Sequence, residues 1–184
     1  MDIIELQAGE ASEPYDHWSY AWRLATGRDH GHDLAPSLSA AVSRLPQHSA
    51  GVSALVDRLR VLCADAPPPT EAPDMVHTDL NPGNIMVRDQ VVVAVVDIGN
   101  AVIGTRATDL MNLVWQSFHD PLDGARRTLW TRIITLVGGE GAAVVAATQV
   151  LVSLEARIRD GRHDLVPHLV ARGHRATDEL EALR

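Results

Sequence analysis

Three side chains that carry oxygen ligands lie close together in the middle of the sequence: Asp79, Asn84 and Asp97. Residues 81–83, Asn-Pro-Gly, predict a tight turn between the first two. A predicted hairpin over residues 85–96 then runs out and back, so Asp97 should return beside Asn84. Two carboxylates and an amide suit Mg²⁺, a hard cation that prefers oxygen ligands. A carboxylate left free of the metal can orient a hydroxyl or accept its proton.

The elements around these residues are expected to be mostly helical. β-Branched residues at 85–88 and 91–96 predict two strands joined at Asp89-Gln90, and residues 75–77 form a third, shorter strand candidate. The predicted fold class is α+β, mostly α, with a small β-hairpin among helices. Apolar spacing and turn residues predict one helix ending at Gly27 and others over about 35–45, 52–62, 107–118, 122–137, 142–159 and 164–183.

The central pattern resembles that of a known enzyme family. His77-x-Asp79-x-x-x-x-Asn84, followed by Asp97-Ile98-Gly99, is similar to the catalytic loop and metal-binding triplet of the aminoglycoside phosphotransferase family. That family's usual forms are close to H-G-D-x-x-x-x-N and D-[WFI]-G. Residues 104–110 also resemble the family's G-x-x-x-x-D-L helix start. The resemblance implies a protein-kinase-like C-terminal lobe.

The resemblance also implies roles for single residues. Asp79 would be the catalytic base or would position the hydroxyl, and His77 would brace the catalytic loop. Asn84 and Asp97 would hold Mg²⁺ on the phosphates of ATP or GTP. Asp109 would be a structural anchor. The implied reaction moves a nucleotide γ-phosphate to a hydroxyl of a small molecule, aminoglycoside-like or another cationic acceptor.

Part of the family's machinery has no counterpart in these 184 residues. The family's N-terminal lobe carries a loop over the phosphates and a strand lysine, whereas this sequence contains no lysine and no G-x-G-x-x-G. We therefore expect the N-lobe to be absent, and three interpretations stay open. The chain is a fragment of a phosphotransferase, a half-enzyme completed by a partner chain, or a catalytically silent lobe that acts as a binding module.

The predicted organisation is a single domain over residues 1–184. It begins with a hinge-like segment (1–9), which is followed by helices (10–65) and a proline-rich connector (66–73). The hairpin with its catalytic and metal loops comes next (74–100), and the C-terminal helices end the chain (105–184). If a lobe is missing, an apolar face around Ile3, Ile4 and Leu6 is expected to be exposed, or covered by self-association or a partner chain.

Composition limits the other classes of function. With 46% hydrophobic residues, 184 residues suffice for one domain with a core, and a net charge of -8 argues against a nucleic-acid surface. The single cysteine, Cys63, cannot form an internal disulfide and is expected to be a buried thiol in a reducing compartment. No membrane-spanning run or signal peptide is evident, so a cytoplasmic location and no membrane partner are expected.

Other candidate residues have simpler interpretations. The pair His30 and His32 could bind a metal but lacks further ligands nearby, and residues 138–141 are expected to form an interhelix turn. The four tryptophans are expected to lie in the core. Acidic side chains that could contact a cationic acceptor, or simply face solvent, are Asp16, Asp120, Asp123, Glu155 and Asp160.

Overall fold

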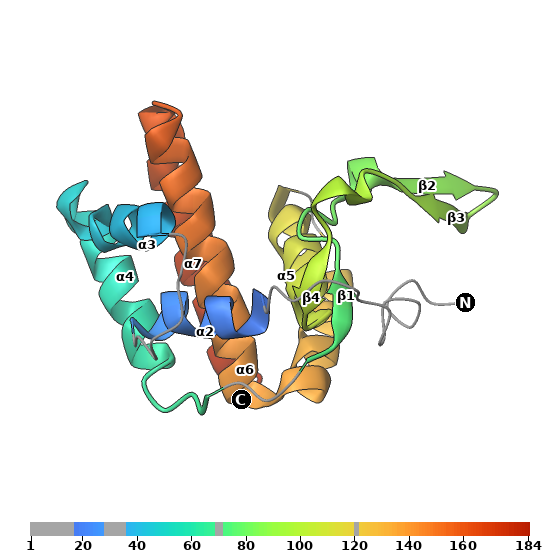
Figure 1. Cartoon of the computed structure of the whole chain (residues 1–184), viewed down its shortest axis with the longest axis horizontal. Coiled ribbons are helices and arrows are strands. Elements are labelled where there is room, and N and C mark those ends of the chain that lie inside the picture. Colours follow the sequence, from blue (N-terminus) through green and yellow to red (C-terminus); the bar gives the residue numbers. More distant parts are fainter. Residues whose placement is uncertain (1–16, 28–35, 69–71, 120–121) are drawn as a thin grey trace. The chain divides into compact units, whose positions relative to one another are not determined.

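The computed structural model describes residues 17–27, 36–68, 72–119 and 122–184 (Figure 1). Helices dominate it and two small antiparallel sheets lie among them, which confirms the predicted fold class. The predicted hinge-like segment and the apolar residues within it lie outside the described residues.

The helices are α2 (His17–Thr26), α3 (Pro36–Ser43), α4 (Ala50–Leu62), α5 (Ala107–Gln116), α6 (Asp123–Arg159) and α7 (Val166–Glu181). The strands are β1 (Asp74–Val76), β2 (Ile85–Arg88), β3 (Val91–Val95) and β4 (Val102–Gly104), and single 3-10 turns are η1 (Leu45–Gln47), η2 (Pro82–Asn84), η3 (Ile98–Asn100), η4 (Ser117–His119) and η5 (His163–Leu165).

The chain packs as two compact units. The β-containing unit comprises Met1–Ser19 and Pro69–Leu136, and the helical unit comprises Tyr20–Pro68 and Val137–Arg184. All of the predicted site residues belong to the β-containing unit. The organisation as one domain over residues 1–184 stays a prediction.

Helix α4 forms the core of the helical unit. It begins after Ser49, whose side-chain oxygen accepts the Val52 backbone N–H at 3.3 Å, as expected of an N-cap. Helix α7 packs closely against α4 at Gly173. A Cβ atom at this position would lie only 2.7 Å from a methyl carbon of Leu55 in α4, so a larger residue would not fit without a shift. Of the apolar series predicted for α4, Val52, Leu55, Val56 and Leu59 are buried, and the last member, Leu62, is only half-buried.

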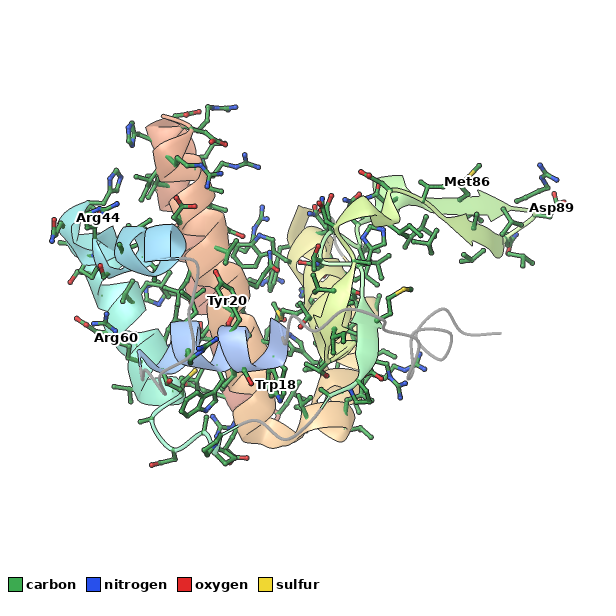
Figure 2. All side chains as sticks on the ribbon, viewed as in Figure 1. Trp18, Tyr20, Arg44, Arg60, Met86 and Asp89 are labelled. Atoms are coloured by element: carbon green, nitrogen blue, oxygen red, sulfur yellow. The ribbon has the colours of Figure 1, made fainter. Side chains whose placement is uncertain are left out.

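The predicted hairpin is present in the β-containing unit. Strands β2 and β3 pair antiparallel, with Ile85 opposite Val95 and an irregularity between Met86 and Val87. Asp89 and Gln90 have φ angles of 50° and 63°, as the mirror-image turns that join two-residue hairpins require. Figure 2 shows Met86 on the hairpin and Asp89 at its tip.

One element differs from the sequence prediction, and one predicted break between helices is confirmed. Strand β4 was not predicted, and it pairs antiparallel with β1 so that Val76 lies opposite Val102. The helices predicted over 122–137 and 142–159 are both present within the range of α6, and they meet at Gly138, whose φ of 73° and ψ of 175° are not helical. The break falls at the first residue of the predicted interhelix turn.

Buried side chains match the predicted core. All four tryptophans are buried, with exposed fractions of 7% or less, and Cys63 is fully buried. By length and composition, α6 is the one described helix that could cross a membrane, with an 18-residue window of mean hydropathy 1.5. Of that window, 56% is buried inside the protein, and core helices have the same composition. This finding therefore does not identify a membrane segment.

Candidate active site

The predicted catalytic loop leaves the end of strand β1. Val76, the last residue of that strand, is fully buried, and His77 follows it directly with 2% of its surface exposed. The start of α5 is tied to the same strand, since the Arg106 backbone N–H donates to an Asp74 carboxylate oxygen at 3.2 Å. The Arg106 guanidinium also lies 3.7 Å from that carboxylate. Strand β1 and helix α5 therefore form a fixed base for the loop.

Asp109 on α5 anchors the first residues of the loop. It is fully buried, and its two carboxylate oxygens accept the backbone N–H groups of His77 at 2.7 Å and Thr78 at 3.0 Å. Hydrogen bonds to a buried carboxylate are about twice as strong as neutral ones. One turn later on the helix, Asn112 donates its side-chain N–H to the Thr78 carbonyl at 2.8 Å. The role of structural anchor expected for Asp109 fits this geometry.

The ring of His77 connects the catalytic loop to the residue that follows strand β3. Its Nε2 lies 2.8 Å from the Val96 carbonyl oxygen, and its Nδ1 lies 3.4 Å from the backbone N–H of Asp79. Because a carbonyl only accepts and an N–H only donates, these partners assign the proton to Nε2 and leave Nδ1 as the acceptor. His77 thus braces the loop from inside, and its ring contacts the backbone of Asp79.

Thr78 has a left-handed backbone, with φ 69°. This conformation is costly for a β-branched residue, by about 1–3 kcal/mol. The bonds to Asp109 and Asn112 hold it, and its hydroxyl donates to the Asn100 carbonyl at 3.3 Å. The left-handed conformation gives a physical reason for glycine as the family's usual residue at this position.

Asp79 and Asn84 are brought together by the Asn-Pro-Gly turn. The Asn84 side-chain nitrogen donates to the Asp79 carbonyl at 2.9 Å and lies 3.4 Å from its carboxylate. Asn81 also donates to that carboxylate at 3.1 Å and accepts the Gly83 N–H at 2.9 Å. Since these bonds use the Asn84 nitrogen, its side-chain oxygen is left to accept other ligands.

Asp97 lies at the end of the hairpin, next to the strand that leaves Asn84. The Val96 N–H donates to the Asn84 backbone carbonyl at 3.0 Å, while the Val96 carbonyl accepts from His77. Asp97 itself has a left-handed backbone, with φ 62°, and is exposed. Its carboxylate makes no hydrogen bond or ion pair with any residue that the structure describes.

The residues at this site fit a hard divalent cation. The Asp97 carboxylate has no partner among the described residues, and Asp97 follows Val96, whose backbone N–H bonds the Asn84 carbonyl. Asp97 and Asn84 therefore offer oxygen ligands only. In the described ranges no three His, Cys, Asp or Glu side chains cluster, so a denser acidic or histidine metal centre is not seen there. A site with few protein oxygens matches Mg²⁺, which keeps waters and takes other ligands from phosphates.

The secondary candidates do not gather at this site. His30, His32, Asp16 and Asp120 lie outside the described residues. Asp123 instead bonds to the buried Arg126 in the same unit. The two remaining acids, Glu155 and Asp160, belong to the helical unit and both lie near Arg159.

Sequence reasoning missed the residues that hold the loop from behind. These are Asn112, which donates to the Thr78 carbonyl, and Thr78, which donates to the Asn100 carbonyl, whereas Asn81 was predicted as part of the turn. The available signal was the pair Asp109 and Asn112, two polar residues one turn apart whose buried neighbours in α5 are all apolar. Such a pair on a buried helix face has to satisfy other polar groups.

Comparison with known proteins agrees with this geometry. The model of the phosphotransferase enzyme family, APH, matches residues 5–141, which include every residue of the candidate site. No curated protein and no solved structure matches the chain. Members of that family carry out phosphotransfer that depends on a nucleotide and magnesium. Because the match covers well over half of its length, the chain belongs to the phosphotransferase enzyme family.

Proposed function

We propose that this chain transfers the γ-phosphate of ATP or GTP to a hydroxyl group of a small molecule. The observation that carries the proposal is the hydrogen-bonded pair of Asp79 and Asn84, together with a backbone bond from Val96 to Asn84 that ties the residue before Asp97 to this pair. The Asp97 carboxylate has no partner among the described residues. Phosphoryl transfer needs little covalent chemistry from the protein, and it depends on positioning and on stabilisation of phosphate charge. Oxygen ligands held by a rigid loop supply such positioning.

Each residue has a distinct role in the proposal. Asn84 and Asp97 hold Mg²⁺, which neutralises charge on the nucleotide phosphates when it is bound. Asp79 orients the acceptor hydroxyl and receives its proton, and the amide groups of Asn81 and Asn84 keep its carboxylate in place. His77 does not contact the substrate and positions Asp79 through the backbone. The acidic net charge of -8 supports a small, cationic acceptor over a nucleic acid.

The test is binding of magnesium-ATP and magnesium-GTP, measured by thermal shift and calorimetry. A ligand at 100 times its Kd stabilises the folded state by about 2.7 kcal/mol. Asp97→Asn should abolish this stabilisation, and Asp79→Asn should retain it because Asp79 is not a metal ligand. Asp89→Asn removes a carboxylate at the tip of the same hairpin and should bind as the wild type does. A shift that survives Asp97→Asn would refute the metal assignment.

The lack of lysine among these 184 residues favours a second candidate, a catalytically silent lobe that acts as an interaction module. Such a module would retain the loop geometry as a scaffold only. The same binding experiment separates the two candidates. A folded chain that binds neither nucleotide with magnesium supports the silent module, and its partners should then be sought before its substrates.

A further inference from the structure

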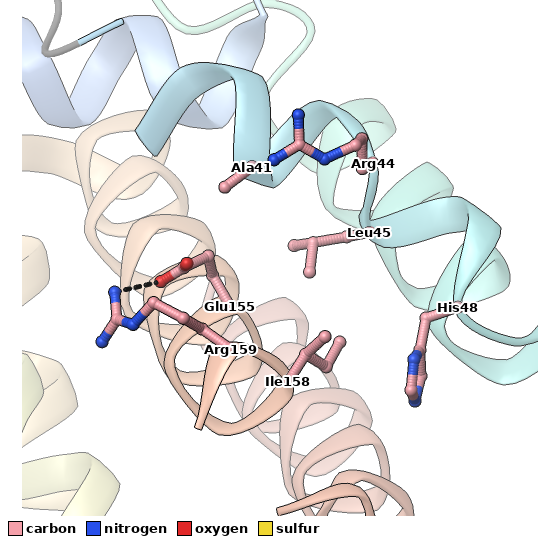
Figure 3. Close-up of a pocket in the computed structure, with 7 residues that line it drawn as sticks. All are labelled: Ala41, Arg44, Leu45, His48, Glu155, Ile158 and Arg159. Carbon is pink, nitrogen blue, oxygen red and sulfur yellow. Dashed lines mark hydrogen bonds and ion pairs between the residues drawn. The ribbon is translucent and has the colours of Figure 1, made fainter. Parts of the chain in front are cut away.

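The helical unit contains a cavity of about 460 Å³ between the α3–η1 segment and the C-terminal end of α6 (Figure 3). Its volume falls in the range of small-molecule sites, about 300–1,000 Å³. Ala41, Leu45 and Ile158 give it apolar walls. Its polar groups come from Arg44, His48, Glu155 and Arg159. None of these residues belongs to the candidate active site.

Glu155 is the buried polar group of the cavity. Its exposed fraction is 7%, and Oε2 accepts a hydrogen bond from Arg159 at 3.0 Å. Its second oxygen, Oε1, accepts no hydrogen bond from any residue in the described ranges. Oε1 keeps some access to solvent, since the described side-chain atoms that are both buried and without a partner do not include it. The cavity therefore presents an acceptor that an amine or ammonium group would satisfy.

Arg44 supplies the opposite charge. Its guanidinium makes no ion pair or hydrogen bond with another described residue, whereas Arg159 is shared between Glu155 and Asp160, at 3.0 and 3.5 Å. Two guanidinium groups and one carboxylate line the cavity. An amine alone would meet the repulsion of the arginines, and a carboxylate alone would leave Oε1 without a donor.

We propose that this cavity binds a small zwitterion of the amino-acid type. Its ammonium group donates to Glu155 Oε1, its carboxylate pairs with Arg44, and its side chain lies against Leu45 and Ile158. His48, whose ring stacks on His163 at a centroid distance of 5.2 Å, adds an aromatic wall and favours an aromatic side chain. The proposal does not depend on the phosphotransferase activity.

Calorimetry on the full chain with three matched probes tests the proposal. L-Phenylalanine carries both charges, 3-phenylpropionate lacks the amine and phenethylamine lacks the carboxylate. Phenylalanine should bind at least about tenfold more tightly than either analogue, since each analogue loses a charge-assisted bond. Equal binding of all three, or no binding of phenylalanine to the folded chain, would overturn the proposal.

Two variants assign the two charges. Glu155→Gln should remove the preference over 3-phenylpropionate, and Arg44→Gln should remove the preference over phenethylamine. Arg44 is exposed, so its variant tests the proposal even if Glu155→Gln does not fold. Arg60→Gln, a half-exposed arginine on α4 away from the cavity, is the control and should bind as the wild type does. Magnesium-ATP binding, measured in parallel, reports separately on the proposed function.

Discussion

Asp109 holds the catalytic loop through its two carboxylate oxygens, each of which accepts a different backbone N–H, from His77 and from Thr78. The exposed acids of the site depend on this buried one, because His77 in turn contacts both the Asp79 backbone and the Val96 carbonyl. Positioning in this protein therefore begins with a residue that does not face the substrate.

Asp109→Asn should destabilise the protein and loosen the loop. The amide retains one acceptor oxygen and turns a donor toward the second backbone N–H, so one charge-assisted bond is lost. The expected loss in free energy of unfolding is about 2 kcal/mol. Urea denaturation measures it, and faster amide hydrogen exchange at His77 and Thr78 localises it. Unchanged exchange at these two amides would contradict the anchoring role, and the exposed Asp89→Asn is the matched control.

Burial raises the pKa of the Cys63 thiol to about 12, although the charge of Arg184 lowers it slightly. The thiol should therefore stay unreactive toward a disulfide reagent at pH 8 until the chain unfolds.

The raised pKa of the Cys63 thiol in the folded chain also makes the stability of the protein depend on pH. The free energy of unfolding keeps its full contribution from the protonated thiol below pH 9.0, the pKa of the thiol in the unfolded chain. As the pH rises from there toward 12, this contribution is lost by about 1.4 kcal/mol per pH unit. Unfolding measured from pH 8 to 11 should show this decrease in the wild type and a smaller one in Cys63→Ala.

The β2–β3 hairpin is the element that exposes the largest share of apolar side chains. Met86, Val87 and Val93 are more than half exposed, and the two strands form a sheet of their own with an unpaired edge on each side among the described residues. Strand β3 contains only valine and alanine. Uncharged, open strand edges pair readily with other chains.

Val93→Lys should therefore lower self-association and leave stability within about 0.5 kcal/mol of the wild type. Light scattering over a range of concentrations measures the association. The control is Val61→Lys, which changes a valine of 77% exposure on helix α4, outside any strand. If both variants reduce association equally, apolar exposure in general is responsible and the strand edge has no special role.

The elements that sequence alone predicted are those set by local patterns. Apolar spacing is sufficient for α4, and β-branched residues around Asp89-Gln90 are sufficient for the hairpin. Strand β4 was missed because its three residues are extended only through pairing with β1, about 30 positions earlier. The left-handed backbone of Thr78 was missed for a similar reason, since hydrogen bonds from α5 stabilise it.

At the scale of the whole chain, two of the described helices, α2 and α6, contribute residues to both compact units, and α6 is the one with a non-helical residue inside it. The change from one unit to the other falls after Leu136, and the interruption of the helix falls at Gly138. The combination of φ 73° and ψ 175° is essentially restricted to glycine. No described heavy atom comes closer than 3.9 Å to a Cβ built there, so any cost of a side chain is conformational and not steric packing.

Gly138→Ala consequently tests whether the interruption is required. If the fold needs this positive φ, alanine should lower the free energy of unfolding by about 1–3 kcal/mol, measured in urea. Gly124→Ala, in the first turn of the same helix and with nothing within 4 Å of its Cβ, should be neutral or slightly stabilising. Wild-type stability of Gly138→Ala with increased helical ellipticity would mean that α6 can run straight.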